Sequence, residues 1–229
     1  MKRILLTGVL FSMLQACATS GPKPFVYGDF KAVKVLPYDS PTQVIYRIDD
    51  HRFITLERYR DCNHGDTYFN DTKTSVRTYL GRGGIENFRG KLIIADSTER
   101  NVVIPSSAPP QLNCGDRGCV VSLIYSTDGG RTFHGTDYMR AFDPLQESRR
   151  YSIYVDRNSY FVEKMRQSDS VTNRFPLLPG FVYGQDTLPD DNKIQFDVKD
   201  PVGLRSPSGQ ERFSCNASIR PTNPDAPLK

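Results

Sequence analysis

Cysteines are the residues of this sequence that are best suited to chemistry, either as disulfides or as metal ligands. Cys114 and Cys119 flank the turn-forming sequence Gly-Asp-Arg-Gly, which favours a local bridge and leaves Cys62 to pair with Cys215. The spacing does not exclude the other two connectivities of these four cysteines. Their spacing lacks the CxxC or HxxxH pattern of zinc sites, so we expect neither a metal site nor a cofactor.

Disulfides require an oxidising compartment, and the N-terminus predicts export to one. Lys2 and Arg3 precede an uncharged apolar stretch, residues 4–14, that is too short to span a bilayer. Leu-Gln-Ala then stands directly before Cys17, and this pattern resembles a bacterial lipoprotein signal with cleavage before Cys17 and lipid on its thiol. The alternative is an ordinary secretory signal that is cleaved shortly after this cysteine.

The expected organisation is a single exported domain with a lipid anchor. The expected segments are a signal peptide at residues 1–16, a tether at 17–27, one β-rich domain at 28–219 and a C-terminal tail at 220–229. We expect the protein in the bacterial cell envelope, facing the periplasm, with the outer membrane favoured over the inner. Removing the signal lowers the net charge from +4 to about +2, and interspersed charges argue against nucleic-acid binding.

A second motif, from Ser126 to Phe133, resembles the Asp-box pattern Ser-x-Asp-x-Gly-x-Thr with an aromatic residue after it. Asp128 is expected to accept backbone hydrogen bonds, Gly130 to take a positive φ, and Phe133 to pack onto the core, while Thr132 completes the motif. We therefore expect a structural hairpin turn. The alternative is a glycan-binding or glycan-hydrolysing propeller, which a single copy supports weakly because propellers repeat the motif in each blade.

Residues that could catalyse a reaction are few. The sequence has no Gly-x-Ser-x-Gly motif and no glycine-rich phosphate loop between a strand and a helix. We expect the three histidines, His51, His64 and His134, in loops or on the surface. The acidic pair Asp49-Asp50 is expected to stabilise a tight turn. We therefore expect no enzymatic activity.

The elements that must position these residues are short strands. Residues 44–48 and 53–59 flank a polar turn and predict a hairpin, and residues 151–155 and 160–164 predict a second. Further strands are predicted at residues 91–95, 102–104 and 120–125. The predicted fold class is mainly β, with antiparallel sheets in a sandwich-like or distorted propeller-like arrangement that disulfides staple.

At most short helices are expected. Asp143 suits the N-cap of one, Pro144 its first position, and Gln146 can complete a capping box. This helix must end before Tyr151, where the second hairpin begins.

One polar segment, from Tyr59 to Asp71, has the composition of a recognition loop. It holds Tyr, Arg, Asp and Asn at high density around Cys62, and Tyr and Arg are favoured anchors at protein interfaces. The expected partner-binding residues are Tyr59, Arg60, Asp61, His64 and Tyr68. The alternative is a plain polar connection between strands.

These residues together resemble a known family. Residues 44–62, 68–71 and 88–95, the Cys114/Cys119 pair and the 126–133 motif are similar to immunity lipoproteins of type VI secretion phospholipase (lipase) effectors. The likeness covers roughly residues 40–165. It implies a non-enzymatic protein that binds one membrane-attacking phospholipase toxin in the periplasm and blocks it. A structural envelope lipoprotein that binds no toxin is a further alternative.

Overall fold

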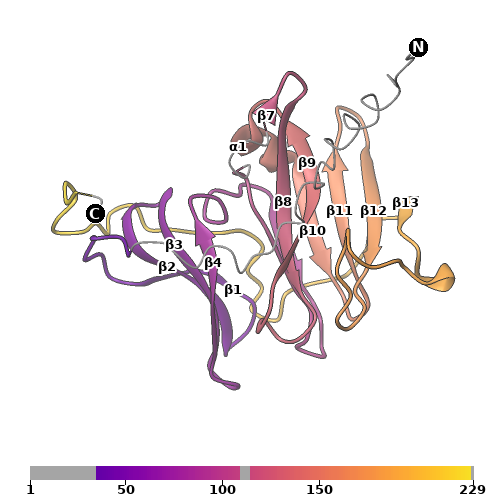
Figure 1. Ribbon diagram of the computed structural model, residues 1–229, viewed down its shortest axis with the longest axis horizontal. Helices are drawn as coiled ribbons and strands as arrows, with labels where there is room; N and C mark the ends of the chain where they lie inside the picture. Colours follow the sequence, from indigo (N-terminus) through magenta and orange to yellow (C-terminus); the bar gives the residue numbers. More distant parts are fainter. Residues whose placement is uncertain (1–34, 109–113, 228–229) are drawn as a thin grey trace, which may run out of the picture.

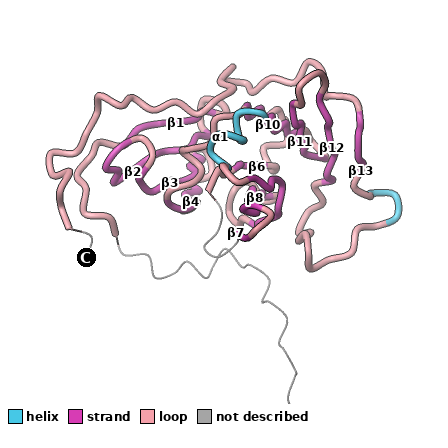
Figure 2. The backbone as a smooth tube through the Cα atoms, turned by 90° about the horizontal axis from the view of Figure 1, so that it is seen from above, coloured by secondary structure: helices cyan, strands magenta, loops and turns pink. Residues whose placement is uncertain are grey.

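The computed structural model describes residues 35–108 and 114–227 and folds them into three β-sheets that lie side by side (Figures 1 and 2). The β1–β4 sheet is a meander of β1 (Gln43–Arg47), β2 (Arg52–Asp61), β3 (His64–Asp71) and β4 (Val76–Arg82). The β6–β9 sheet contains β6 (Val102–Pro105), β7 (Cys114–Gly115), β8 (Gly118–Ser126) and β9 (His134–Ala141). The β5–β13 sheet runs β13 (Gln195–Val198), β12 (Ser170–Pro176), β11 (Ser159–Met165), β10 (Tyr151–Val155) and β5 (Lys91–Ile94).

The prediction of a mainly β fold with short helices is confirmed. Helical structure in the described residues is limited to α1 (Pro144–Glu147) and two 3-10 turns, Ser148–Arg150 and Asp190–Asn192. Asp143 caps α1 as expected, because its carboxylate accepts a hydrogen bond from the backbone N–H of Gln146 at 3.0 Å.

Both predicted hairpins are present, and one strand pair differs from the antiparallel expectation. β1 pairs with β2, and β10 pairs with β11, each antiparallel. β5 and β10 are parallel, with Leu92 opposite Ile153. The whole β6–β9 sheet and α1 lie between them in the sequence, which supplies the long crossover that parallel neighbours need.

One continuous hydrophobic core joins the three sheets. Ile54 and Phe69 from the β1–β4 sheet, Leu123 from the β6–β9 sheet and Ile153 from the β5–β13 sheet are all fully buried in the same cluster. Each such side chain contributes about 1.5–3 kcal/mol by leaving water. The sheets therefore form one packed body, which fixes the surfaces that they present to solvent.

The segment Ser126–Phe133 forms a tight turn between β8 and β9. The Asp128 carboxylate accepts hydrogen bonds from the backbone N–H groups of Arg131 (3.1 Å) and Thr132 (3.0 Å). Gly130 has a φ of 81°, and a Cβ there would lie 2.2 Å from the Phe69 ring. Phe133 packs on that same ring, with 5.9 Å between centroids. All of these contacts hold the backbone in shape, which is what a structural turn requires.

Residues 206–219, here called the C-terminal strap, run back across the molecule between β1 and β5 (yellow in Figure 1). The backbone N–H of Ser214 donates to the carbonyl of Ile45 at 2.8 Å, and that of Leu92 donates to the carbonyl of Glu211 at 2.8 Å. Phe213 packs on Tyr46 with 5.3 Å between ring centroids. The strap thus covers strand edges that would otherwise be open to pairing with another chain.

Two disulfides staple the fold, with the connectivity that the spacing favoured. Cys62 at the β2–β3 turn is bonded to Cys215 in the strap, and Cys114 of β7 is bonded to Cys119 of β8. The first joins residues 153 positions apart and the second residues 5 apart.

The end of the chain, where a tail was expected, has no helix or strand within residues 220–227. Two hydrogen bonds, one to the Asp39 side chain and one from the Asn223 side chain, nevertheless connect it to the segment before β1. The backbone N–H of Thr222 donates to the Asp39 carboxylate at 2.8 Å, and the Asn223 amide donates to the carbonyl of Pro37 at 2.8 Å.

Candidate functional site

Tyr59, which was expected to bind a partner, is fully buried in the core, so that prediction is wrong. Its hydroxyl accepts a hydrogen bond from the Gln43 side chain at 2.7 Å. The physical reason is a bulge in β2: Arg58 has a φ of 44°, and the pairing with β3 shifts register between Glu57 and Asp61. The bulge reverses the alternation of side chains, so Tyr59 turns inward.

Arg60, Asp61 and His64 lie together at the β2–β3 turn. The His64 ring (Nδ1) lies 2.7 Å from the Asp61 carboxylate, and the Arg60 guanidinium (Nε) lies 3.4 Å from the same group. The side chains of Arg60 and His64 are 48% and 60% exposed, so both are accessible to a partner. The structure therefore brings three of the five expected residues into one exposed cluster.

Tyr68, the fifth expected residue, lies on the solvent side of the β1–β4 sheet among arginines and a tyrosine that were not predicted from the sequence. The Arg77 guanidinium lies over its ring, 4.0 Å from the centroid, and Tyr79 stands directly opposite it on β4 with 5.3 Å between ring centroids. Arg58 donates a hydrogen bond to the Tyr68 hydroxyl. We call the set Arg58, Tyr68, Arg77, Tyr79 and Arg82 the Arg–Tyr face.

One half-buried and one buried carboxylate, those of Glu57 and Asp66, hold the arginines of the Arg–Tyr face in position. Arg77 makes a two-pronged contact with Glu57, each N–O distance being 2.8 Å. Asp66, only 2% exposed, lies 3.1 Å from Arg58 and 2.7 Å from Arg82. Burial opposes ionisation of Glu57, but hydrogen bonds from Arg77 and Thr55 outweigh it and lower its pKa. These side chains are ordered before a partner arrives, which reduces the entropy lost on binding.

One tyrosine of this face, Tyr79, keeps its proton. Burial, followed by the negative charge of Asp66, raises the pKa of Tyr79 well above its ordinary value. Its hydroxyl is therefore a neutral donor and acceptor at any physiological pH. Strand alternation places Tyr68 and Asn70 on one side of β3 and Arg77 and Tyr79 on one side of β4, and the pairing of the two strands then brings these sides together.

Comparison with known families places this surface in context. Residues 38–164 match a family model described as the T6SS Tli3 immunity protein. The match covers just over half of the chain. The chain belongs to the T6SS Tli3 immunity protein family. A search among curated proteins finds no match.

The matched range of this immunity protein contains the β1–β4 and β6–β9 sheets, and therefore the β2–β3 turn and the Arg–Tyr face. The C-terminal strap lies beyond it. Within the described residues no helix is long and apolar enough to cross a membrane. Cys17 and the expected signal and tether lie outside the described residues.

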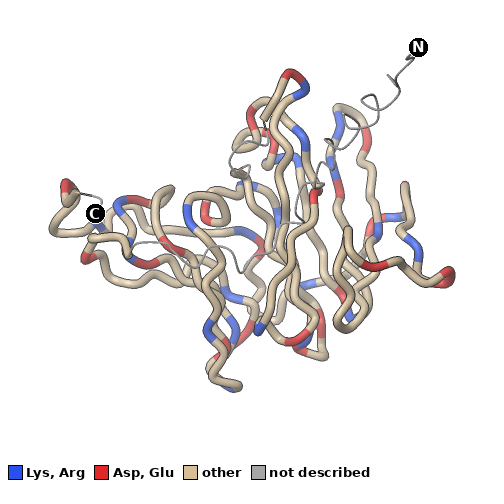
Figure 3. Tube along the Cα trace, viewed as in Figure 1, with Lys and Arg blue, Asp and Glu red and all other residues tan. Residues whose placement is uncertain are grey.

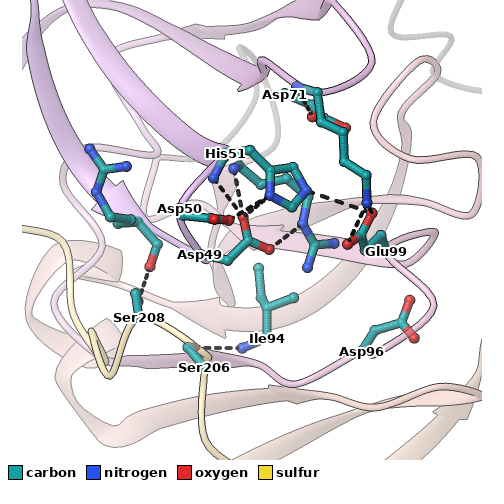
Figure 4. Close-up of polar contacts among 12 residues, drawn as sticks. Asp49, Asp50, His51, Asp71, Ile94, Asp96, Glu99, Ser206 and Ser208 are labelled. Carbon is teal, nitrogen blue, oxygen red and sulfur yellow. Dashed lines mark hydrogen bonds and ion pairs between the residues drawn. The ribbon is translucent and has the colours of Figure 1, made fainter.

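A second polar cluster of this immunity protein surrounds the β1–β2 turn (Figure 4). The Asp49 carboxylate accepts from the backbone N–H of Arg52 at 2.7 Å and pairs with its guanidinium (Nε) at 2.7 Å. His51 lies 2.7 Å from Asp50 through Nδ1 and 3.6 Å from Glu99 through Nε2. Ligand atoms of Asp49, Asp50 and His51 lie within 4.8 Å of one another, yet the Arg52 guanidinium already pairs with the Asp49 carboxylate.

The acidic surroundings of His51 should make stability depend on pH. Its hydrogen bond with Asp50, followed by the charges of Asp49, Glu99 and Asp71, raises its pKa against the effect of burial. The charged imidazole therefore stabilises the folded state fully below about pH 6.5, the ordinary histidine pKa, and this contribution is lost as pH rises through the raised value.

We expect the melting temperature of the native chain to fall, relative to that of His51→Gln, between about pH 6 and pH 8.5. Thermal unfolding of both proteins across that range measures the difference. His64→Gln, which removes an imidazole that is 60% exposed, is the matched control. Parallel curves for the native chain and His51→Gln would contradict the prediction.

Proposed function

We propose that this immunity protein is anchored by lipid on Cys17 at the periplasmic side of the cell envelope, with the outer membrane favoured. There it binds one molecule of a type VI secreted antibacterial phospholipase and neutralises it. The observation that carries the proposal is the family match over residues 38–164, which makes the chain a T6SS immunity protein. The phospholipase target and the anchor rest on the resemblance of the sequence and on its N-terminal motif.

The described surface suits a protein that acts by binding. Tyr and Arg dominate the binding energy of many interfaces, and the Arg–Tyr face presents both in a pre-organised arrangement. Membership of an immunity family suggests that the protein is not a catalyst. A lipid anchor would raise the concentration of the inhibitor at the membrane that a phospholipase attacks.

The test is protection of living cells. A host that exports the lipase effector of the same bacterium to its periplasm should lyse, and co-expression of this chain should restore growth. A catalytically inactive variant of the lipase controls for effector burden. Failure of the native chain to protect, at a level that immunoblotting confirms, would overturn the proposal.

The anchor is tested separately with Cys17→Ala. We expect this variant to leave the membrane fraction, to lose labelling by radioactive fatty acid, and to protect less well at equal abundance. Equal protection would remove the anchor from the mechanism and leave toxin binding intact.

A further inference from the structure

A cavity of about 450 Å³ opens beside the Cys62–Cys215 disulfide. Phe88, Phe213 and the disulfide provide apolar lining, and Glu86, Arg89 and Arg212 provide charged lining. Phe88 is 2% exposed and meets Phe213 edge to face with 6.5 Å between ring centroids, so this part of the lining is rigid. A volume of this size accommodates one or two side chains of a partner.

Two positive charges without a counter-charge meet at this cavity. Arg89 donates to the Asn63 side-chain oxygen at 3.2 Å, and Arg212 donates to the carbonyl oxygen of Arg89 at 2.6 Å. Both side chains are exposed, and neither forms an ion pair within the part of the chain that the structure describes. Elsewhere charges of both signs are interspersed (Figure 3), and Arg58 and Arg77 have carboxylate partners.

Glu86, the acidic residue of the lining, does not cancel this charge near neutral pH. It is 8% exposed, and its carboxylate accepts hydrogen bonds from the backbone N–H groups of Gly83 (3.0 Å) and Gly84 (3.1 Å). Burial raises its pKa to about 7 in spite of these hydrogen bonds. A substantial fraction of the molecules therefore carry a neutral Glu86, and the cavity is positive overall.

We propose that this cavity binds an acidic side chain on a protruding segment of the phospholipase effector. This inference rests on the function proposed above. A carboxylate matches the two guanidinium groups, and a partly enclosed site strengthens such charge-assisted hydrogen bonds. Asn63 lies both on the cavity and in the β2–β3 turn with Arg60 and His64, so the cavity continues the exposed cluster of that turn.

The experiment measures binding of the processed full chain, in detergent, to a catalytically inactive variant of the effector. The double variant Arg89→Gln/Arg212→Gln should bind about tenfold more weakly or worse, with a smaller loss of affinity between low and high salt. Arg89→Lys/Arg212→Lys should retain part of the affinity and of the salt dependence, because it keeps the charge. Arg149→Gln/Arg157→Gln, which removes two exposed arginines outside the cavity, is the matched control.

Native affinity in the Gln double variant overturns this inference and leaves the proposed function standing. Absence of binding by the native chain overturns both. Vesicles that contain phosphatidylglycerol distinguish a lipid phosphate from a protein carboxylate. If the Gln double variant loses vesicle binding but not effector binding, the cavity is a lipid site and the inference is wrong.

Discussion

Replacing Cys62 and Cys215 together by Ala should lower the melting temperature by roughly 10–20 °C. The bond closes a loop of 153 positions, and the chain-entropy model gives such a loop about 5 kcal/mol of stabilisation through restriction of the unfolded state. In a chain of this size each kcal/mol corresponds to roughly 2–4 °C. Calorimetry or circular dichroism of the exported chain measures the shift.

The second disulfide provides the control. Cys114→Ala/Cys119→Ala opens a loop of 5 positions, for which the same model gives about 2 kcal/mol, so its melting temperature should fall by less than half as much. Equal shifts for the two double variants would contradict the entropic explanation. They would assign the effect of Cys62–Cys215 to native-state contacts of the strap, such as those of Phe213 with Tyr46 and Phe88.

Elements whose stability is local could be predicted from the sequence. The hairpins at β1–β2 and β10–β11 each place two strand-forming segments on either side of a polar turn. The helix cap at Asp143 and the turn at Asp128 each satisfy their hydrogen bonds within a few residues. Interactions between residues close together in the sequence are therefore sufficient to determine these elements.

The missed features depend on distant contacts. Tyr59 turns inward at a bulge, and it fits there because residue 65 is glycine: a Cβ at that position would lie 2.4 Å from the Tyr59 Cβ. The C-terminal strap has no repeating pattern, and it is held by the edges of β1 and β5 and by Cys215. Long-range packing of this kind overrides local alternation.

The candidate site was predictable only in part, because some of its residues come together through distant contacts. Composition alone predicted that Arg60, Asp61 and His64 are accessible, because polar turns are exposed wherever they occur. Arg77 and Tyr79 come from β4, and only the pairing of β3 with β4 places them beside Tyr68. The cavity has lining residues from the β2–β3 turn, the loop before β5 and the strap, and the strap lies more than a hundred positions from the other two in the sequence.

Tyr68→Ala should weaken binding of the effector about thirtyfold or more while the protein remains folded, since hot-spot tyrosines contribute about 2 kcal/mol or more. The substitution removes the ring under the Arg77 guanidinium and the hydroxyl that Arg58 contacts, so two pre-positioned arginines lose their support. Titration calorimetry with the catalytically inactive effector measures the affinity, and thermal unfolding reports the stability of each variant.

Tyr154→Ala is the matched control for this change. Tyr154 is a half-buried strand tyrosine of the β5–β13 sheet, and its hydroxyl donates to Glu163 at 2.7 Å, so its removal deletes a similar ring and a similar polar contact on a different sheet. A Tyr68→Ala variant that binds as tightly as the native chain would exclude the Arg–Tyr face from the interface. Equal weakening by both variants would show that the loss follows from general destabilisation. Selective weakening by Tyr68→Ala places the effector on the β1–β4 sheet, because only that substitution disturbs the arginines that Glu57 and Asp66 hold in place.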